Sequence, residues 1–280
     1  MTSLDFDQHR APTHPRPAAT LVLLRDAREG LEVVVMQRSL QSSFMGGAIV
    51  FPGGRIEPHD ARAEWPDGTF TAGDGPWWDD EGFAARIAGC REALEEVSIV
   101  PVAGEPLRRE EAESLRLAAA KPEPALRAAL VTLGRRLDLS SLVPLSRWVT
   151  PEAENKRFDA RFFVARAPAG QEGEMDRREA IRTFWARPAS LLEDWEKGAV
   201  ALFPPTHRTL EQLATHPTVE AALAAARLAP LDVICPRFVL DGGVATLALP
   251  GDPLHTVRER LSPGGSRYVL RGERWISTDP

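Results

Sequence analysis

Three glutamates, Glu92, Glu95 and Glu96, follow Arg91 within five positions of the chain. On a helix, residues three and four positions apart share a face, so this spacing brings the three carboxylates together. Like charges at that spacing repel each other by about 0.2–0.5 kcal/mol per pair. A hard divalent cation takes oxygen ligands and would convert the repulsion into binding. The spacing therefore predicts a metal site, with a solvated acidic helix face as the alternative.

The elements around the glutamates must supply a helix and a turn for such a site. Residues 83–97, FAARIAGCREALEEV, combine apolar and acidic faces at helical spacing and are predicted to be a helix. Upstream, a short strand at 48–51 ends at Gly53 and Gly54. Two glycines let the backbone turn sharply and approach a ligand, with a carbonyl oxygen available to a cation.

The rest of the chain alternates strand-like and helix-like segments, which predicts an α/β fold with a mixed sheet flanked by helices. Residues 58–81 are rich in Pro, Gly, Asp and Trp and are predicted to be a long surface insertion. We expect strands at 18–26, 31–39, 141–150, 157–167 and 180–186, two helices within 105–136, further helices between 188 and 227, and hairpins around 241–243 and 271–273.

Composition narrows the possible functions. The 280 residues are 43% hydrophobic, which is ample for a buried core, and the net charge is −6. No block of Lys and Arg is present, so the overall charge does not indicate a nucleic-acid-binding protein. The two cysteines, Cys90 and Cys235, form no CxxC pattern and are expected to be packing residues. The first 17 residues lack the apolar core of a signal peptide, and no apolar stretch approaches the roughly 18 residues of a membrane span, so we expect a cytoplasmic protein without membrane contact.

Two segments, FPGGRIEPHD at 51–60 and REALEEVS at 91–98, together resemble the Nudix box. That box reads Gly, five residues, Glu, seven residues, then Arg-Glu-apolar-x-Glu-Glu-x-Gly-apolar. The resemblance implies a Nudix-type α/β/α sandwich with a mixed sheet. It also implies Mg²⁺- or Mn²⁺-dependent hydrolysis of a nucleoside diphosphate linked to another group.

The segments depart from the box at three places. Asp60 stands where the first glutamate is usual, and thirty residues, 61–90, replace the usual seven. Ser98 stands where a glycine normally ends the helix, because glycine adopts the left-handed conformation easily. The central acidic group is retained.

The resemblance assigns roles to these residues. Glu95 and Glu96 are implied as direct metal ligands, Glu92 as a ligand of a second ion or of a metal-bound water, and Gly53 as a carbonyl ligand. Arg91 would hold a carboxylate through its planar guanidinium group.

The general base is left open by the sequence. In this family it comes from the box or from a loop before a later strand, where Glu174 and Glu179 are candidates. Glu57, beside the glycines, either orients a ligand or is a surface acid of a turn.

A second resemblance, over residues 18–215, is carried by residues 36–54 and 148–165 and by the interrupted box. These segments are similar to the coenzyme A diphosphatase branch of the family, which includes a mammalian peroxisomal enzyme and has a long insertion in its box. The implied substrates are coenzyme A and acyl-coenzyme A. Arginines recognise phosphate groups through paired hydrogen bonds. The expected substrate-binding residues are Arg38, Gly53, Gly54, Arg157 and Arg161, while Phe158, Phe162 and Phe163 are assigned to core packing.

These observations predict three segments: a proline-rich stretch at 1–17, a hydrolase domain at 18–215 with an insertion at about 58–82, and an extension at 216–280 packed on the same domain. The extension could cap the domain or form a homodimer contact. Two alternatives to a coenzyme A diphosphatase stay open. One is hydrolysis of ADP-ribose, NADH or dinucleoside polyphosphates, and the other is a non-catalytic Nudix-fold regulator, although such regulators usually lose acids of the box.

Overall fold

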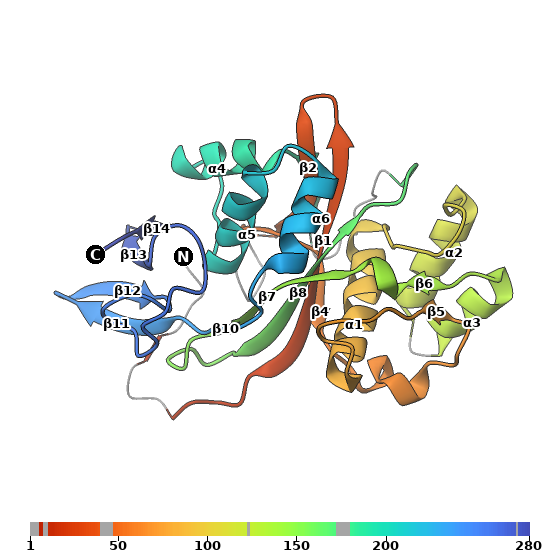
Figure 1. Ribbon diagram of the computed structural model, residues 1–280, viewed down its shortest axis with the longest axis horizontal. Coiled ribbons are helices and arrows are strands. Elements are labelled where there is room, and N and C mark those ends of the chain that lie inside the picture. The colour runs from red at the N-terminus through yellow and green to blue at the C-terminus, as the bar shows by residue number, and fades with distance from the viewer. Residues whose placement is uncertain (1–5, 8–10, 40–46, 122–123, 172–179, 273) are drawn as a thin grey trace.

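The structure is a computed structural model that describes residues 6–7, 11–39, 47–121, 124–171, 180–272 and 274–280. Within this part of the chain, eight strands form one mixed sheet, shown in Figure 1. Its strands are ordered β10-β7-β8-β1-β2-β3, with β4 paired to β1 and β9 paired to β2. They span Arg16–Ala27 (β1), Gly30–Arg38 (β2), Ile49–Val50 (β3), Gly53–Arg55 (β4), Val143–Val149 (β7), Phe158–Arg166 (β8), Ala180–Ala186 (β9) and Val233–Ile234 (β10).

Strand β1 lies at the centre of this sheet because both of its faces are apolar. Leu21 and Leu23 pack into the core on one side of the sheet, and Val22 and Leu24 pack into the core on the other. All four side chains are fully buried. β1 pairs in parallel with β8 and antiparallel with β2, so the sheet is mixed, as the sequence predicts.

Helices cover both faces of the sheet, which confirms the predicted α/β/α arrangement (Figure 1). Helices α1 (Asp80–Val97), α2 (Arg109–Ala119) and α3 (Ala125–Leu133) lie on one side. On the other side lie α4 (Pro188–Glu196), α5 (Pro204–Ala214) and α6 (Val219–Leu228). No helix in the described part of the chain is both long and apolar enough to cross a membrane.

Helix α1 begins three residues earlier than the sequence predicts. The side chain of Asp79 accepts a hydrogen bond of 2.8 Å from the amide of Gly82 and caps the first turn. Such a cap satisfies a backbone donor that would otherwise have no partner, and it fixes the start of the helix at Asp80. The last residues of the predicted insertion at 58–82 therefore belong to α1.

The insertion is packed against the domain through its own side chains. Trp65 is 1% exposed and belongs to the core beneath α1, α2 and α3. A short strand, β5 (Phe70–Thr71), pairs in parallel with β6 (Leu137–Asp138). Two short 3-10 helices, Pro58–Asp60 and Arg62–Glu64, precede it, and a third spans Leu139–Ser141.

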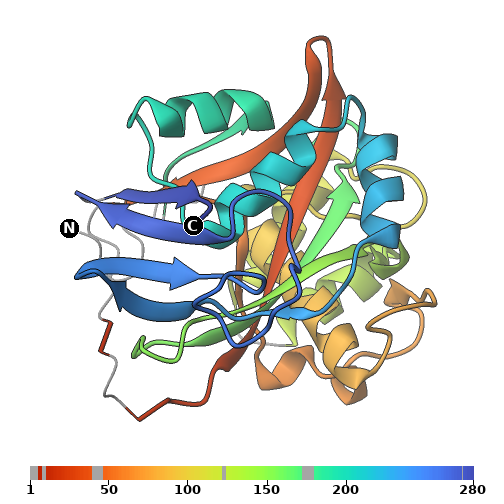
Figure 2. The same cartoon turned by 60° about the vertical axis from the view of Figure 1, so that its left-hand side comes forward.

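The C-terminal region forms a second, four-stranded antiparallel sheet beside α5, visible in Figure 2. Its strands are β11 (Arg237–Asp241), β12 (Val244–Ala248), β13 (Arg267–Arg271) and β14 (Arg274–Thr278). They form the hairpins expected around 241–243 and 271–273, of which residue 273 lies outside the described residues. Tyr268 and Trp275 of this sheet share a core with Leu210 of α5.

The N-terminal segment also reaches the C-terminal sheet. The ring of Phe6 stacks on that of Phe238 with centroids 4.5 Å apart, and it meets Trp275 edge-on. The amide of Asp7 donates a hydrogen bond of 2.9 Å to the carbonyl of Ala153. Residues near the start of the chain thus lie between the loop after β7 and the C-terminal sheet.

Candidate active site

The two halves of the box, separated by thirty residues in the sequence, meet in the fold. The Nε and Nη2 atoms of Arg91 donate to the two carboxylate oxygens of Asp60, each over 3.1 Å. Asp60 is fully buried and Arg91 is 7% exposed. Paired hydrogen bonds between guanidinium and carboxylate fix orientation as well as distance. Asp60 therefore holds Arg91, which is a positioning role that the sequence pattern alone does not indicate.

Arg91 in turn holds two of the three glutamates. Its Nη1 donates to Glu92 over 2.7 Å and to Glu95 over 3.2 Å, while Nη2 also donates to the carbonyl of Arg55. Burial alone would lower the pKa of Arg91, but the hydrogen bonds and charges of Asp60 and Glu92 raise it. Arg91 therefore stays charged at the centre of the acidic group.

Burial and the repulsion expected from the spacing both act on the pKa of Glu95. Burial, and then the negative charge of Glu92, raise the pKa of Glu95 to about 7, against the lowering effect of Arg91. A carboxyl group with such a pKa is only partly ionised near neutral pH, and a nearby positive charge would favour its ionised form.

The glycine turn lies directly against this group. The amide of Gly53 donates to Oε2 of Glu96 over 2.9 Å. A Cβ atom placed on Gly54 would come within 2.5 Å of the carboxylate carbon of Glu92. Glu92 can keep this position only if residue 54 has no side chain, because its carboxylate occupies the space that a Cβ atom would fill.

Helix α1 ends at the position where the box normally carries glycine. Ser98 has a φ of 58°, in the left-handed region, and its amide bonds to the carbonyls of Ala93 and Leu94. The serine adopts the conformation that glycine adopts at low cost. This departure in the sequence leaves the helix end intact.

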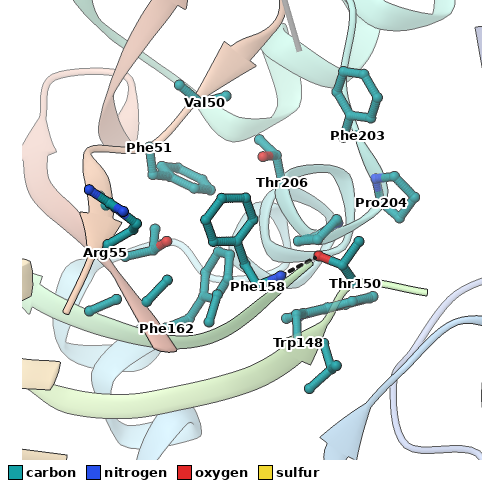
Figure 3. A pocket seen from close by; sticks show the side chains of 18 of the residues that line it. Val50, Phe51, Arg55, Trp148, Thr150, Phe158, Phe162, Phe203, Pro204 and Thr206 are labelled. Carbon is teal, nitrogen blue, oxygen red and sulfur yellow. Dashed lines mark hydrogen bonds between the residues drawn. The ribbon is translucent and has the colours of Figure 1, made fainter. Parts of the chain in front are cut away.

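A cavity of about 460 Å³ opens beside the box, and Figure 3 shows its interior. Gly53, Gly54, Glu92 and Glu96 line it, so these predicted site residues are brought together at one cavity. The other side chains of its wall are largely apolar. Those drawn and labelled in Figure 3 are Val50, Phe51, Arg55, Trp148, Thr150, Phe158, Phe162, Phe203, Pro204 and Thr206.

The predicted phosphate-binding arginines separate into two groups. Arg38, at the end of β2, lines the cavity. Arg157 instead donates to the backbone carbonyls of Thr13 and Thr150, over 2.6 and 3.0 Å. Arg161 donates to Glu81, at the start of α1, over 2.6 Å.

The structure therefore does not bring Arg157 and Arg161 to the cavity. Side chains alternate along a strand, and the face of β8 that meets the cavity carries Phe158, Ala160 and Phe162. Arg161 lies on the opposite face, toward α1.

The assignment to core packing is correct for Phe162 and Phe163, which are 6% and 0% exposed and belong to the two hydrophobic cores. Phe162 is both buried and part of the cavity wall, and Phe158 is half-buried in that wall. Trp148 of β7, opposite Ala160 of β8, also contributes. Alternation along β8 could have predicted that Phe158 and Phe162 share a face, but not that the face borders a cavity.

Of the other predicted site residues, the structure describes Glu57 but not the two candidates for the general base. Glu174 and Glu179 lie outside the described residues. The side chain of Glu57 pairs with Arg55 over 3.1 Å, and the Glu57 amide donates to Asp60. Across the described residues, no three His, Cys, Asp or Glu side chains are arranged as a ready metal site. In the box, Arg91 forms ion pairs with both Glu92 and Glu95.

The mixed sheet between helices and the split acidic box define the class of the protein. The chain superimposes with a TM-score of 0.68 on the crystal structure of a Nudix hydrolase from Alicyclobacillus acidocaldarius. The two sequences are 30% identical, and the match covers 78% of this chain and 99% of the other. The chain therefore belongs to the Nudix hydrolase family. No family model matches the chain.

Within this family the chain resembles the coenzyme A diphosphatase branch. It is 24% identical over 225 residues to acyl-coenzyme A diphosphatase NUDT19 of Xenopus laevis, covering 65% of this chain and 59% of that protein. It is 26% identical over 292 residues to the human protein of the same name, covering 87% of this chain and 75% of the relative. The match thus spans about three fifths of the frog relative's length.

Proposed function

We propose that the protein is a divalent-metal-dependent diphosphatase that cleaves a nucleoside diphosphate linked to another group, with coenzyme A and acyl-coenzyme A as preferred substrates. The observation that carries this proposal is the common cavity of Glu92, Glu96, Gly53 and Gly54. Acidic oxygen donors and a close backbone turn thereby border a space large enough for a small-molecule ligand.

The donor set fits Mg²⁺ or Mn²⁺, because both metals prefer oxygen ligands. Glu92, Glu95 and Glu96 provide carboxylates from one helix, and the absence of a side chain at Gly54 leaves room for Glu92. When bound, such an ion supplies positive charge that screens the diphosphate and lowers the pKa of an attacking water. We assign Glu92, Glu95 and Glu96, with a carbonyl of Gly53, to hold it.

The chain's own residues prepare this site. Asp60 orients Arg91, and Nη1 of Arg91 holds both Glu92, which lines the cavity, and Glu95. The amide of Gly53 orients Glu96. These contacts within the protein fix the carboxylates relative to the glycine turn and so prepare the site for the diphosphate.

The preference for coenzyme A is supported by the names of the relatives and by the basic residues of the cavity. Arg38 and Arg55 both line it, and Arg55 directly follows the glycine turn. Guanidinium groups bind phosphate oxygens through charge-assisted hydrogen bonds. Coenzyme A carries a 3′-phosphate in addition to the diphosphate, so we expect arginine contacts to favour it over its 3′-dephospho form.

A panel of substrates tests the proposal. Coenzyme A, hexanoyl-coenzyme A, 3′-dephospho-coenzyme A, ADP-ribose, NADH and a dinucleoside polyphosphate would be incubated with Mg²⁺ or Mn²⁺, and the products separated by chromatography. We expect adenosine 3′,5′-bisphosphate and a phosphopantetheine product, formed only with metal. Highest kcat/KM on ADP-ribose, NADH or the dinucleotide would replace the substrate assignment, and no hydrolysis of any compound would favour a regulator.

Two further measurements refine the result. A thermal-shift series should show stabilisation by Mg²⁺ or Mn²⁺, because a ligand that binds only the folded state raises its stability. Replacing Arg38 by Ala should narrow the preference for coenzyme A over its 3′-dephospho form. One lost charge-assisted contact corresponds to about tenfold in this ratio. An unchanged ratio would remove Arg38 from phosphate recognition.

A further inference from the structure

The cavity beside the box has two chemically different parts. Its charged lining residues, Arg38, Arg55, Glu92 and Glu96, come from β2, β4 and α1. A second part, here called the aromatic chamber, is formed by Phe51, Trp148, Phe158, Phe162 and Phe203. In Figure 3, Arg55 lies on the opposite side of the view from Trp148 and Phe203, with the other rings between them.

The aromatic chamber is enclosed by elements from distant parts of the sequence. Phe158 and Phe162 project from one face of β8, and Trp148 lies on the neighbouring strand β7. Phe203 immediately precedes α5 and closes the chamber from the other side of the cavity (Figure 3). Phe6, Pro236 and Leu247 complete the wall from the N-terminal segment and the C-terminal region.

Hydrogen-bonding side chains are few in the chamber, where Thr150 and Thr206 supply hydroxyl groups (Figure 3). The hydroxyl of Thr150 already accepts a hydrogen bond of 3.0 Å from the amide of Phe158. Helix α5 begins with Pro204 and Pro205, and proline has no amide hydrogen, so this helix start offers an anion fewer donors than most. Among the described lining residues, the only charged side chains are the four named above.

This distribution of charge distinguishes the two halves of coenzyme A. The nucleotide half carries a 3′-phosphate, and burying its charge without cations would be costly. The pantetheine half is uncharged, has two methyl groups close to the diphosphate, and ends in the sulfur that carries an acyl group. Only the second half suits a chamber of aromatic rings without cations.

We propose that the aromatic chamber binds the pantetheine half of the substrate together with the acyl group on its sulfur. The nucleotide half then lies on the side of Arg55 (Figure 3). This inference rests on the proposed coenzyme A diphosphatase function and adds its specificity-determining residues, foremost Phe158 and Phe203. It also gives the C-terminal region a role, since that region helps to enclose the chamber.

Binding of the two halves as separate ligands tests the inference without catalysis. 4′-Phosphopantetheine and adenosine 3′,5′-bisphosphate would be titrated calorimetrically into the wild-type protein, Phe158→Ala, Phe203→Ala and a control, Phe70→Ala. Phe70 lies in β5, outside the cavity. Loss of one buried ring should weaken phosphopantetheine binding by about tenfold or more in both chamber variants. Binding of the bisphosphate should weaken by no more than about twofold in either of them.

Phe158 is only half-buried, so replacing it does not remove a side chain from a fully packed position of the core. Phe158→Leu should recover most of the affinity for phosphopantetheine that Phe158→Ala loses. Selective loss of the bisphosphate would place the nucleotide base in the chamber and overturn the inference. Equal weakening of both ligands would overturn it as well.

The acyl part has its own measurement. Hexanoyl-4′-phosphopantetheine should bind more tightly than the unacylated compound, by about three- to fourfold for each methylene that is buried. Equal affinities would exclude an acyl site. If phosphopantetheine binds as expected but coenzyme A is never hydrolysed, the assignment of the chamber as a pantetheine site is supported and the proposed enzymatic function is wrong.

Discussion

Asp60 and Arg91 form a buried ion pair, with each carboxylate oxygen 3.1 Å from a different guanidinium nitrogen. Asp60 belongs to a short 3-10 helix just after the glycine turn, and Arg91 lies in the middle of α1. Arg91 also contacts Glu92 and Glu95, so the pair fixes these two glutamates relative to the glycine turn. The thirty-residue insertion leaves the pair intact.

Asp60→Asn should therefore lower both stability and activity. Removing one charge of a buried pair leaves the other uncompensated, which typically costs about 3–5 kcal/mol. We expect such a loss in the free energy of unfolding, measured by urea denaturation. The control is Asp67→Asn, which breaks an exposed pair with Arg62 in the same insertion and should cost at most about 1 kcal/mol. Equal effects of the two changes would contradict a structural role for Asp60.

Glu96→Gln should remove activity and spare the fold. The amide oxygen of glutamine can still accept the hydrogen bond from Gly53, but the negative charge is lost. We expect kcat to fall at least about a hundredfold, or about 2.7 kcal/mol of barrier, with an unchanged melting temperature. Glu113→Gln, at an ion pair on α2, is the matched control. Near-normal turnover of Glu96→Gln would show that the box is not the active site.

The two glycines of the turn should respond differently to alanine. At Gly53 an added Cβ would meet the carbonyl oxygen of Ala19 at 2.5 Å and the Cα of Thr20 at 2.9 Å, both in the backbone of the central strand. Such a clash cannot be relieved by a side-chain rotation and should cost about 1–3 kcal/mol of stability.

At Gly54 the three atoms nearest to the added Cβ all belong to the carboxylate group of Glu92, which can rotate away. We therefore expect Gly54→Ala to keep its thermal stability but to lose activity, because Glu92 is displaced. Thermal denaturation and steady-state kinetics on both variants separate the two effects. A Gly54→Ala enzyme with normal kcat/KM would show that the position of Glu92 is unimportant.

His207 should make the stability depend on pH. Burial, and then the charge of Arg208, lower the pKa of His207 to about 4, from an ordinary value near 6.5. Between these values the unfolded chain binds a proton that the folded protein does not, so stability falls as the pH falls from about 6.5 to 4. The full effect is on the order of 3 kcal/mol.

Urea denaturation between pH 4 and 7 checks this expectation, with His207→Gln as the comparison. The glutamine variant cannot titrate and should show a smaller slope of stability against pH across this range. Parallel slopes for the two proteins would mean that His207 does not contribute. His207 Nδ1 and the hydroxyl of Tyr268 form a hydrogen bond of 2.9 Å. The variant loses this bond, so we also expect a loss of stability that does not depend on pH.

The sequence was sufficient for features that depend on neighbouring residues. Apolar spacing predicts α1, and the glycines and glutamates of the box can be recognised although thirty residues divide them. A helix face is determined by intervals of three and four residues, so the convergence of Glu92, Glu95 and Glu96 follows from local geometry alone. The main strands were predictable for the same reason, because alternation is also local.

Only the tertiary structure decided what each face contacts. Arg161 and Phe162 are adjacent in β8, yet one points toward Glu81 of α1 and the other lines the cavity. Alternation predicts that they point in opposite directions but not which direction meets the ligand. The partner of Arg91 and the enclosure of the chamber by Phe203 likewise depend on contacts between distant segments, and local sequence patterns carry no information about such packing.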